Sequence, residues 1–456
     1  MKKLVFLAFM ALATMLSAQK TDYYEGNLEF KGQKLPLTLE VSISKDTIAF
    51  LGSPAQTKEL IPATKIVLRN DSLMFSVKQL KATFKGKINQ TKDTVCGNFK
   101  QLFVEIPLCL VKKEKPEIII NRPQNPPANP SYIQEEITFR TQGVDYDFKG
   151  TLTYPKKEGK YPLMIMISGS GLQNRDEEIM QHRPFAVIAD YMANNGIAVF
   201  RYDDRGFGTE DTALFNATTL DFANDVESAL NALKNHPNID ADKIGLVGHS
   251  EGGLIAPIVA SRNSSVAFIV LLAGPGIDGK ETLLLQNKKI CEINGMADSL
   301  INKRLTILEK LLDMSTSTAN NEMLSKIDSI VKQHTLSREE RKAIGYSPKE
   351  VMATSTQLQH KWMQSFITLD PCPYLSKVKC PILALNGDKD CQVLAIENTE
   401  AITRCTNGKA EIIILPNLNH LFQTCETGNA NEYMTIEETI SEEVLETMTE
   451  WIKKKL

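Results

Sequence analysis

The chain has 456 residues, of which 42% are apolar and 23% are charged. This composition is typical of soluble globular proteins, and the length is too great for one ordinary core, so we expect two or three domains. The net charge is −3 and no basic run exceeds the three lysines at 453–455, which argues against a nucleic-acid-binding surface.

The N-terminus has the parts of a secretory signal. Lys2 and Lys3 precede an apolar stretch over residues 4–16, and Ala18 offers a small residue for cleavage. The stretch is short for a membrane span, although an N-terminal anchor is the alternative. We expect removal of the signal peptide, residues 1–18, a periplasmic or secreted mature chain, and no membrane span after removal.

The chain contains eight cysteines and no CxxC pair. They are Cys96, Cys109, Cys291, Cys372, Cys380, Cys391, Cys405 and Cys425. Export permits disulfides, but buried free thiols are an equal alternative and the spacing does not reveal the pairing. Because no Cys/His cluster has zinc spacing, we expect no metal and no cofactor.

Residues 19–112 show the two-residue period of half-buried strands, with one sheet face in a core and the other in water. The apolar residues alternate in three stretches: Leu35, Leu37, Leu39, Val41 and Ile43; Leu73, Phe75 and Val77; and Leu102, Val104, Ile106, Leu108 and Leu110. We expect a small all-β N-terminal domain, either a meander, a sandwich or a half-barrel. It contains no catalytic constellation.

Residues 113–131 contain five prolines, which cannot build a sheet interior, so we expect a stiff linker there. From residue 132 to 456, short apolar runs alternate with helical stretches. This rhythm predicts a doubly wound α/β domain with a mostly parallel sheet. The runs are Pro162–Ser168, Gly196–Tyr202, Lys243–Gly248, Val266–Ala273, Pro381–Asn386 and Ala410–Leu415.

The interval over about 276–379 is too long for a crossover connection and contains no such run. Ile301, Leu305, Leu308 and Leu312 follow helical spacing instead. We therefore expect a helical cap inserted over the active site.

Gly248-His249-Ser250-Glu251-Gly252 matches the pattern G-x-S-x-G. It lies between a predicted strand and a predicted helix, the context in which this pattern forms the nucleophile elbow of an α/β-hydrolase. The sharp turn strains the serine, exposes its hydroxyl and requires glycine neighbours for close backbone approach. We predict Ser250 as the nucleophile; a glycine-rich turn with an idle serine is the alternative.

A serine nucleophile needs a general base, and in this fold the histidine follows the serine and the acid in the chain. Three histidines follow Ser250. His334 and His360 lie in the predicted cap. His420 lies in a loop after the predicted strand Ala410–Leu415, so it is the predicted base.

The base in turn needs an orienting carboxylate. Asp388 and Asp390 both follow the predicted strand Pro381–Asn386. Asp390 lies past the turn, where it can reach back to His420. We favour Asp390, with Asp388 as the runner-up.

The oxyanion of the tetrahedral intermediate needs preorganised N–H donors. The backbone N–H of Glu251 is one candidate. The second should come from the loop Ser168-Gly169-Ser170-Gly171, where we choose Ser170, with Gly171 as the alternative. The side chains of His249 and Glu251 are expected to pack locally or face the pocket.

Several motifs accompany the elbow: Ser168-Gly169-Ser170-Gly171 with Asn174-Arg175-Asp176-Glu177, then Asp204-Arg205-Gly206, Asp370-Pro371, and the run from Leu385 to Val393. Together they resemble the EstD-type α/β-hydrolases, carboxylesterases that are grouped with serine aminopeptidase-like hydrolases. The resemblance covers about residues 132–456 and implies that Ser250, Asp390 and His420 are nucleophile, acid and base. Asn174 stands where the family pattern has Asp. We read Asp203, Asp204 and Arg205 as a turn held by charge-assisted hydrogen bonds.

Three functions follow from these residues. The first is hydrolysis of a small-molecule carboxylic ester through an acyl-enzyme, without metal or cofactor. The second is a serine aminopeptidase with the same triad, in which Glu251 or Glu292 would hold a free amino terminus. The third is a binding protein with an idle hydrolase domain. In the cap, Trp362 and Phe366 lie four apart and either line the acyl pocket or form ordinary cap core.

Overall fold

The structure is a computed structural model that describes residues 20–30, 33–43, 47–53, 57–69, 71–101, 104–114, 121–209 and 214–456. The predicted signal peptide lies outside these residues. The chain divides near residue 120 into two compact units, here called the N-terminal unit and the C-terminal unit. Within the described ranges, no helix combines the length and apolar character needed to cross a membrane.

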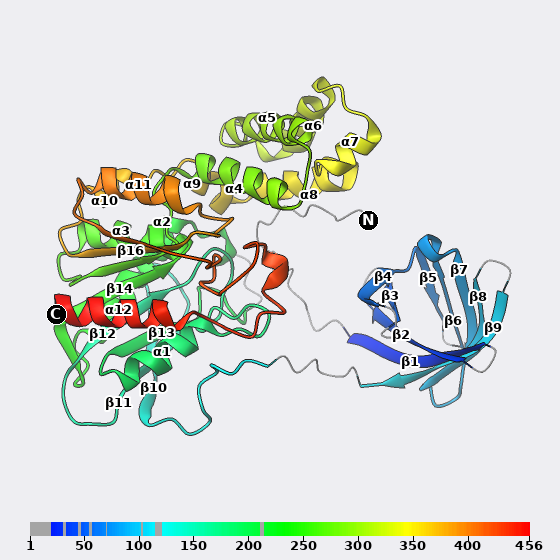
Figure 1. Cartoon of the computed structure of the whole chain (residues 1–456), viewed down its shortest axis with the longest axis horizontal. Coiled ribbons are helices and arrows are strands. Elements are labelled where there is room, and N and C mark those ends of the chain that lie inside the picture. Colours follow the sequence, from blue (N-terminus) through cyan, green and yellow to red (C-terminus); the bar gives the residue numbers. More distant parts are fainter. Residues whose placement is uncertain are drawn as a thin grey trace. The chain divides into compact units, whose positions relative to one another are not determined.

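The N-terminal unit is one antiparallel sheet with the strand order β4-β3-β2-β1-β9-β8-β7-β6-β5 (Figure 1). Its strands are β1 (Lys20–Phe30), β2 (Gln33–Ile43), β3 (Ile48–Ser53), β4 (Thr57–Pro62), β5 (Lys65–Leu68), β6 (Ser72–Val77), β7 (Ala82–Ile88), β8 (Thr94–Gln101) and β9 (Val104–Lys113), with a short 3₁₀ helix, η1 (Lys78–Leu80). β3 and β5 also contact each other, so the sheet curls around its own core.

The predicted alternation in this unit is confirmed in the middle of the strands, whereas Val104, at the start of β9, is exposed. Leu39 in β2, Leu73 in β6 and Leu110 in β9 are fully buried. Leu102 lies outside the described residues. A disulfide joins Cys96 to Cys109, which are direct cross-strand partners in β8 and β9.

The C-terminal unit contains a second sheet with the strand order β10-β11-β13-β12-β14-β15-β16-β17. The strands are β10 (Tyr132–Phe139), β11 (Phe148–Pro155), β12 (Tyr161–Ile167), β13 (Ala198–Tyr202), β14 (Ile239–His249), β15 (Ile269–Leu272), β16 (Ile382–Gly387) and β17 (Glu411–Leu415). The pairs β10–β11 and β11–β13 are antiparallel, and the strands from β13 to β17 pair in parallel.

Helices cover both faces of this sheet, because alternate residues of each buried strand point to opposite faces. Leu163 and Ile165 of β12 pack with α2 (Thr219–Leu233), α3 (Glu251–Arg262) and α11 (Ala395–Cys405). Met164 and Met166 pack on the other side with α1 (Pro184–Asn194) and α12 (Glu442–Lys455), as Figure 1 shows. The short helix α10 (Cys372–Leu375) is joined to α11 by the disulfide Cys372–Cys405.

The six predicted apolar strands are confirmed, each within a few residues of its observed ends. β10 and β11, which pair in antiparallel fashion at one edge of the sheet, were not among the predicted strands. Ile133 and Ile137 share the half-buried face of β10 with the charged Glu135, so the alternation of apolar and polar residues was weak.

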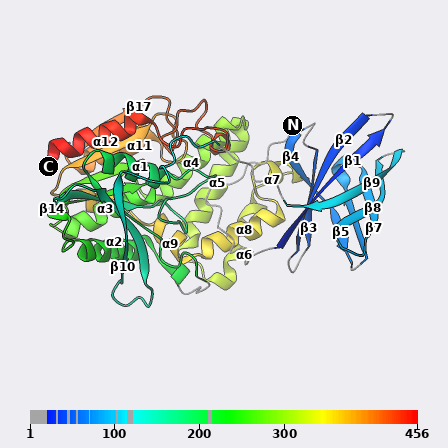
Figure 2. The ribbon, with the colours of Figure 1, turned by 90° about the horizontal axis from the view of Figure 1, so that it is seen from below.

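The predicted helical insertion lies between β15 and β16. It consists of α4 (Gly279–Ile293), α5 (Asp298–Ser315), α6 (Asn320–Gln333), α7 (Arg338–Ala343), α8 (Pro348–Gln359) and α9 (Lys361–Ile367), which together we call the cap. In the views of Figures 1 and 2, α5 to α8 form a group separate from the sheet. Of the predicted stripe, Ile301, Leu308 and Leu312 are buried and Leu305 is half-buried.

The cap begins and ends at one place. Gly279 N, at the start of α4, donates a hydrogen bond to the carbonyl oxygen of Leu369 at 3.2 Å. A Cβ added at Gly279 would collide with the carbonyl of Phe366 in α9, so a glycine is needed for this close approach.

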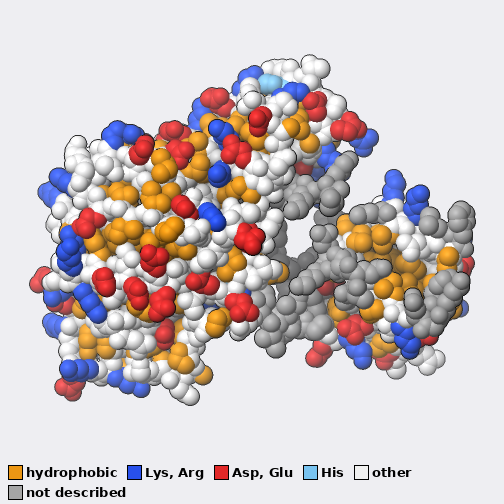
Figure 3. Space-filling model, viewed as in Figure 1, with side chains coloured by type: hydrophobic (Ala, Val, Ile, Leu, Met, Phe, Trp, Pro, Cys, Tyr) orange, Lys and Arg blue, Asp and Glu red, His pale blue; other side chains and the backbone are white. Residues whose placement is uncertain are grey.

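Residues 121–124, which belong to the predicted linker, are bound to the C-terminal unit. Arg122 is buried and donates hydrogen bonds to the carbonyl oxygens of Ile436 at 2.6 Å and Met180 at 2.9 Å. Gln124 accepts a hydrogen bond from Thr439 N at 2.6 Å. The part of the predicted linker after residue 120 is therefore not a free spacer. On the face of the C-terminal unit shown in Figure 3, acidic and basic side chains are interspersed.

Candidate active site

Ser250 stands at the junction between β14 and α3. Its backbone has φ 53° and ψ −118°, a conformation that costs a residue with a side chain on the order of 1–3 kcal/mol. The flanking glycines permit the turn: a Cβ at Gly252 would collide with the carbonyl of Ile167, and one at Gly248 with the backbone of Gly252. The predicted elbow geometry is therefore present.

His420 and Asp390 meet as the sequence predicts. Nδ1 of His420 lies 2.7 Å from Oδ2 of Asp390, and both side chains are buried. The other carboxylate oxygen, Oδ1, accepts hydrogen bonds from the backbone N–H groups of Gln392 at 2.7 Å and Val393 at 2.9 Å. These bonds fix the carboxylate in the orientation that holds the imidazole.

Asp388, the runner-up acid, faces away from the histidine. It is exposed, and its Oδ1 accepts a hydrogen bond from Asn417 N at 2.6 Å. Asp388 is therefore a turn residue, and the structure places Asp390 rather than Asp388 against His420.

The structure brings His420 beside the elbow. Its ring centroid lies 4.8 Å from that of His249, the residue directly before Ser250. Nε2 of His420 has no hydrogen-bond partner among the described residues, and the same is true of the Ser250 hydroxyl. Hydrogen bonds of this kind are often long before substrate binds.

The predicted oxyanion donors also adjoin the elbow. Glu251 is the first residue of α3, where helix geometry leaves the backbone N–H without an intrahelical acceptor. The Ser170 side chain lies close enough to the Glu251 carboxylate to lower its pKa. Gly169 N instead donates to Oε1 of Glu177 at 2.5 Å, so this N–H is already occupied.

A family model described as serine aminopeptidase, S33, matches residues 181–424, more than half of the chain. The chain belongs to this family. This membership confirms the resemblance to the serine aminopeptidase-like α/β-hydrolases and identifies the chain as a hydrolase with that fold.

Individual relatives are more distant. Esterase EstD of Thermotoga maritima is 26% identical over 331 residues, which span 71% of this chain and 70% of that protein. Among solved structures, the hypothetical protein PA2218 from Pseudomonas aeruginosa aligns with a TM-score of 0.46 and 14% identity over 75% of this chain and 100% of that chain. The esterase Pf2001 of Pyrococcus furiosus aligns with a TM-score of 0.40 and 14% identity over 72% and 99%.

In this S33 family member, the side chain of Glu251 links the elbow to the cap. Its buried Oε1 accepts hydrogen bonds from the Thr219 hydroxyl and from the Trp362 indole N–H, both at 2.7 Å. Burial raises the pKa of Glu251, although these two hydrogen bonds and the nearby Ser170 side chain oppose the shift. Glu251 packs locally, as predicted.

Trp362 and Phe366 are stacked in α9 with ring centroids 5.2 Å apart, and both are buried. A small cavity behind the elbow is lined by Gly169, Asp204, Glu251 and neighbouring residues, but by neither of these rings. Their role in an acyl pocket stays a prediction.

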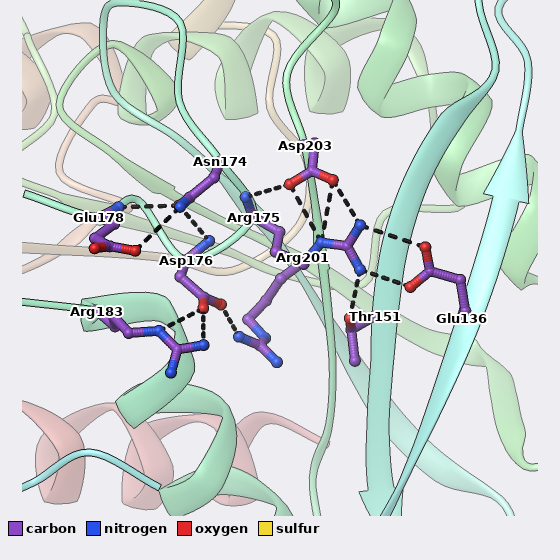
Figure 4. Close-up of polar contacts among 9 residues, drawn as sticks. All are labelled: Glu136, Thr151, Asn174, Arg175, Asp176, Glu178, Arg183, Arg201 and Asp203. Carbon is purple, nitrogen blue, oxygen red and sulfur yellow. Dashed lines mark hydrogen bonds and ion pairs between the residues drawn. The ribbon is translucent and has the colours of Figure 1, made fainter. Parts of the chain in front are cut away.

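The Asn174-Arg175-Asp176-Glu177 loop is held by two ion-pair clusters (Figure 4). In the first, Arg175 pairs with Asp203 at 2.5 Å and with Glu136 at 2.6 Å. In the second, Asp176 pairs with Arg183 and with the buried Arg201.

Asn174 organises the start of this loop. Its Oδ1 accepts hydrogen bonds from the backbone N–H groups of Asp176 at 3.0 Å and Glu178 at 3.1 Å. An acceptor oxygen is all that these bonds require, so Asn fills the position where the family pattern has Asp.

The interpretation of Asp203, Asp204 and Arg205 as a turn held by hydrogen bonds is confirmed. Arg205 pairs with Asp225 at 2.6 Å. Asp204 is half-buried and accepts a hydrogen bond from the Ser168 hydroxyl at 2.6 Å, and desolvation raises its pKa well above the usual value.

Two contacts were missed by sequence reasoning: that of Glu177 with His249 and that of Glu251 with Trp362. Each contact joins residues far apart in the chain. The signal in the sequence was that His249 and Glu251 lie inside the elbow motif, which does not reveal their partners. Within the described ranges, His, Cys, Asp and Glu side chains form no group of three suited to a metal ion.

Proposed function

We propose that this chain is a carboxylic ester hydrolase that works through an acyl-enzyme, with Ser250, His420 and Asp390 as its triad. The observation that carries the proposal is the 2.7 Å contact between His420 and Asp390 beside the strained Ser250. Membership of a serine hydrolase family and the similarity to Esterase EstD support it.

In the acylation step, Asp390 holds the Nδ1–H of His420, which leaves Nε2 free to take the proton of the Ser250 hydroxyl. Oγ then attacks the ester carbonyl carbon, and the carbonyl electron pair moves onto oxygen. When this tetrahedral species collapses, the ester C–O bond breaks and His420 gives its proton to the leaving alkoxide.

In the deacylation step, His420 takes a proton from water, and the resulting hydroxide attacks the acyl carbon. The bond from carbon to Ser250 Oγ breaks, and the proton returns to Oγ. The product is a carboxylic acid, so each cycle consumes one water and restores the enzyme.

The oxyanion of both tetrahedral species would accept hydrogen bonds from the backbone N–H groups of Glu251 and Ser170. The occupation of Gly169 N by Glu177 supports a donor further along this loop. Gly171 is the alternative donor.

A serine aminopeptidase is the second candidate, favoured by the description of the family. It requires a carboxylate free to bind the substrate's amino terminus. The carboxylate of Glu251 is already hydrogen-bonded to the side chains of Thr219 and Trp362, and Glu292 lies on the cap surface near Lys288. These contacts favour the esterase.

The test compares wild-type and Ser250→Ala protein on a nitrophenyl ester, an aminoacyl anilide and a fluorophosphonate probe. We expect the wild type alone to cleave the ester and to take the label. Faster turnover of the anilide would establish the peptidase instead. Absence of both labelling and turnover in the wild type would leave a binding protein with an idle hydrolase domain.

We further propose that the chain is exported and cleaved after Ala18. The signal-like N-terminus and the two cysteine pairs, Cys96–Cys109 and Cys372–Cys405, support an oxidising compartment. N-terminal sequencing of the protein from a fractionated cell should begin at Gln19 in the exported fraction. An intact Met1 on a membrane-bound chain would indicate an anchor.

A further inference from the structure

A second carboxylate–imidazole pair lies beside the proposed triad. Oε1 of Glu177 lies 2.9 Å from Nδ1 of His249, and Nε2 of His249 lies 2.9 Å from the carbonyl oxygen of His420. All three residues are buried. The acyl-transfer steps described above use none of these contacts.

The two partners of His249 determine its protonation. A backbone carbonyl only accepts hydrogen bonds, so Nε2 must carry a proton. Oε1 of Glu177 accepts a hydrogen bond from Gly169 N at 2.5 Å, so this oxygen acts as an acceptor toward both neighbouring groups. Nδ1 must then carry a proton as well, which makes His249 an imidazolium and its contact with Glu177 an ion pair.

The charges around His249 favour this form. Burial alone would lower the pKa of His249, but the charge and hydrogen bond of Glu177, the His420 carbonyl and the charge of Asp390 outweigh it and raise that pKa. The His420 imidazole also faces the ring, 4.8 Å away between centroids.

The ion pair joins three segments of the site. Gly169 belongs to the loop that carries the proposed oxyanion donor, His249 precedes the nucleophile, and His420 is the proposed base. The packing is close, since a Cβ at Gly169 would lie 3.0 Å from Oε1 of Glu177 and 3.1 Å from Cβ of Ser250. Glu177 itself is held at φ 50°, which is unfavourable for any residue other than glycine.

We propose that Glu177 and His249 are positioning residues whose ion pair holds the His420 loop and the oxyanion loop against Ser250. Alignment of base and donors before substrate binds lowers the cost of reaching the transition state. The effect on turnover rests on the proposed ester hydrolysis, whereas the protonation of His249 does not.

Glu177→Gln is the informative variant, because it keeps the size and an acceptor oxygen but removes the charge. Without its counter-ion, the pKa of His249 falls. The imidazolium that is hydrogen-bonded through both nitrogens exists below that pKa and is lost as the pH rises through it. The variant should therefore lose the alignment of the His420 loop and the oxyanion loop at a lower pH than the wild type. Glu178→Gln is the matched control: Glu178 is the exposed neighbour, and among the described residues its carboxylate contacts Asn174.

The first measurement is NMR of full-length protein labelled with nitrogen-15 histidine at about pH 8, well above the ordinary histidine pKa. We expect one histidine protonated on both nitrogens in the wild type and in Glu178→Gln. This signal should be missing in His249→Gln and should change to a neutral ring in Glu177→Gln. A neutral His249 in the wild type overturns the ion pair.

The second measurement is the pH profile of kcat and KM on the nitrophenyl ester. Glu177→Gln should lower kcat by roughly 10–10²-fold with KM unchanged, and the loss should grow with pH. A folded Glu177→Gln with wild-type kcat overturns the positioning role.

If that variant does not fold, Glu177→Asp replaces it, and we expect the imidazolium to persist while kcat falls. A wild type that cleaves no ester contradicts the proposed function instead, and the NMR result still decides the ion pair.

Discussion

The indole N–H of Trp362, in the cap, donates a hydrogen bond at 2.7 Å to the carboxylate of Glu251, the residue that follows the proposed nucleophile, Ser250. Both side chains are buried. The backbone N–H of Glu251 is also a proposed oxyanion donor. The contact therefore connects the cap directly to the residue that would stabilise the transition state.

Trp362→Ala is expected to change the preference between short and long acyl esters, because it removes a large ring and leaves a buried carboxylate without one donor. The triad should still react with a fluorophosphonate. Trp362→Phe removes the donor but retains most of the ring, and so separates the two effects. An unchanged chain-length profile in stably folded Trp362→Ala would remove Trp362 from the pocket.

Ser250→Ala is expected to lower ester turnover by on the order of 10³-fold or more while leaving the fold intact. Initial rates on a nitrophenyl ester and circular dichroism check the two parts. Wild-type turnover in this variant would disprove the assignment of the nucleophile.

Asp390→Asn should reduce turnover by roughly 10²–10⁴-fold, because the charge that orients His420 is lost. Asp388→Asn is the matched control, since Asp388 is exposed and contacts Asn417. Its turnover should stay close to that of the wild type. The reverse result would make Asp388 the acid.

Asp204→Asn should become more stable relative to the wild type as the pH rises. Burial raises the pKa of Asp204 well above its usual value, with Glu177 and Glu251 adding to the shift against hydrogen bonds from Ser168 and Gln173. The folded state thus retains this proton to a higher pH than the unfolded chain, whose pKa is about 4. Wild-type stability is lost as the pH rises from that value through the folded pKa, and asparagine removes this loss.

Thermal unfolding of the two proteins at about pH 5 and about pH 8, on either side of neutrality, measures the effect. A difference in midpoint temperature that does not change with pH would mean that Asp204 does not titrate between these values.

The local patterns of the chain predicted the elbow and the contact between His420 and Asp390, because each of these residues lies next to a strand end and the order of strands brings those ends together. Ser250 and Asp390 follow β14 and β16, and His420 follows β17. The contacts that link separate loops were not predictable in this way. Trp362 meets Glu251 across 111 residues, and their meeting depends on how the cap packs, which no local period encodes.

The position at which the C-terminal unit begins could not be predicted from the sequence either, because it depends on tertiary contacts. Five prolines predicted a linker up to residue 131, yet Arg122 is buried against the carbonyls of Ile436 and Met180. An arginine among prolines looks solvated in the sequence, and its acceptors come from two distant segments, the loop before α1 and the loop before α12.

The adjoining ends of the cap have a consequence for how substrate selection can vary. Because Gly279 packs against the carbonyl of Phe366, the whole segment leaves and rejoins the hydrolase core at one point. Segments whose ends lie close together can be exchanged or shortened without moving the structure that carries them. The sequence and length of the cap can therefore change, or the whole cap can be exchanged by design, between β15 and β16. A replacement cap that retains the Trp362 contact to Glu251 would leave the proposed catalytic residues of the core unchanged and would place different side chains next to the substrate.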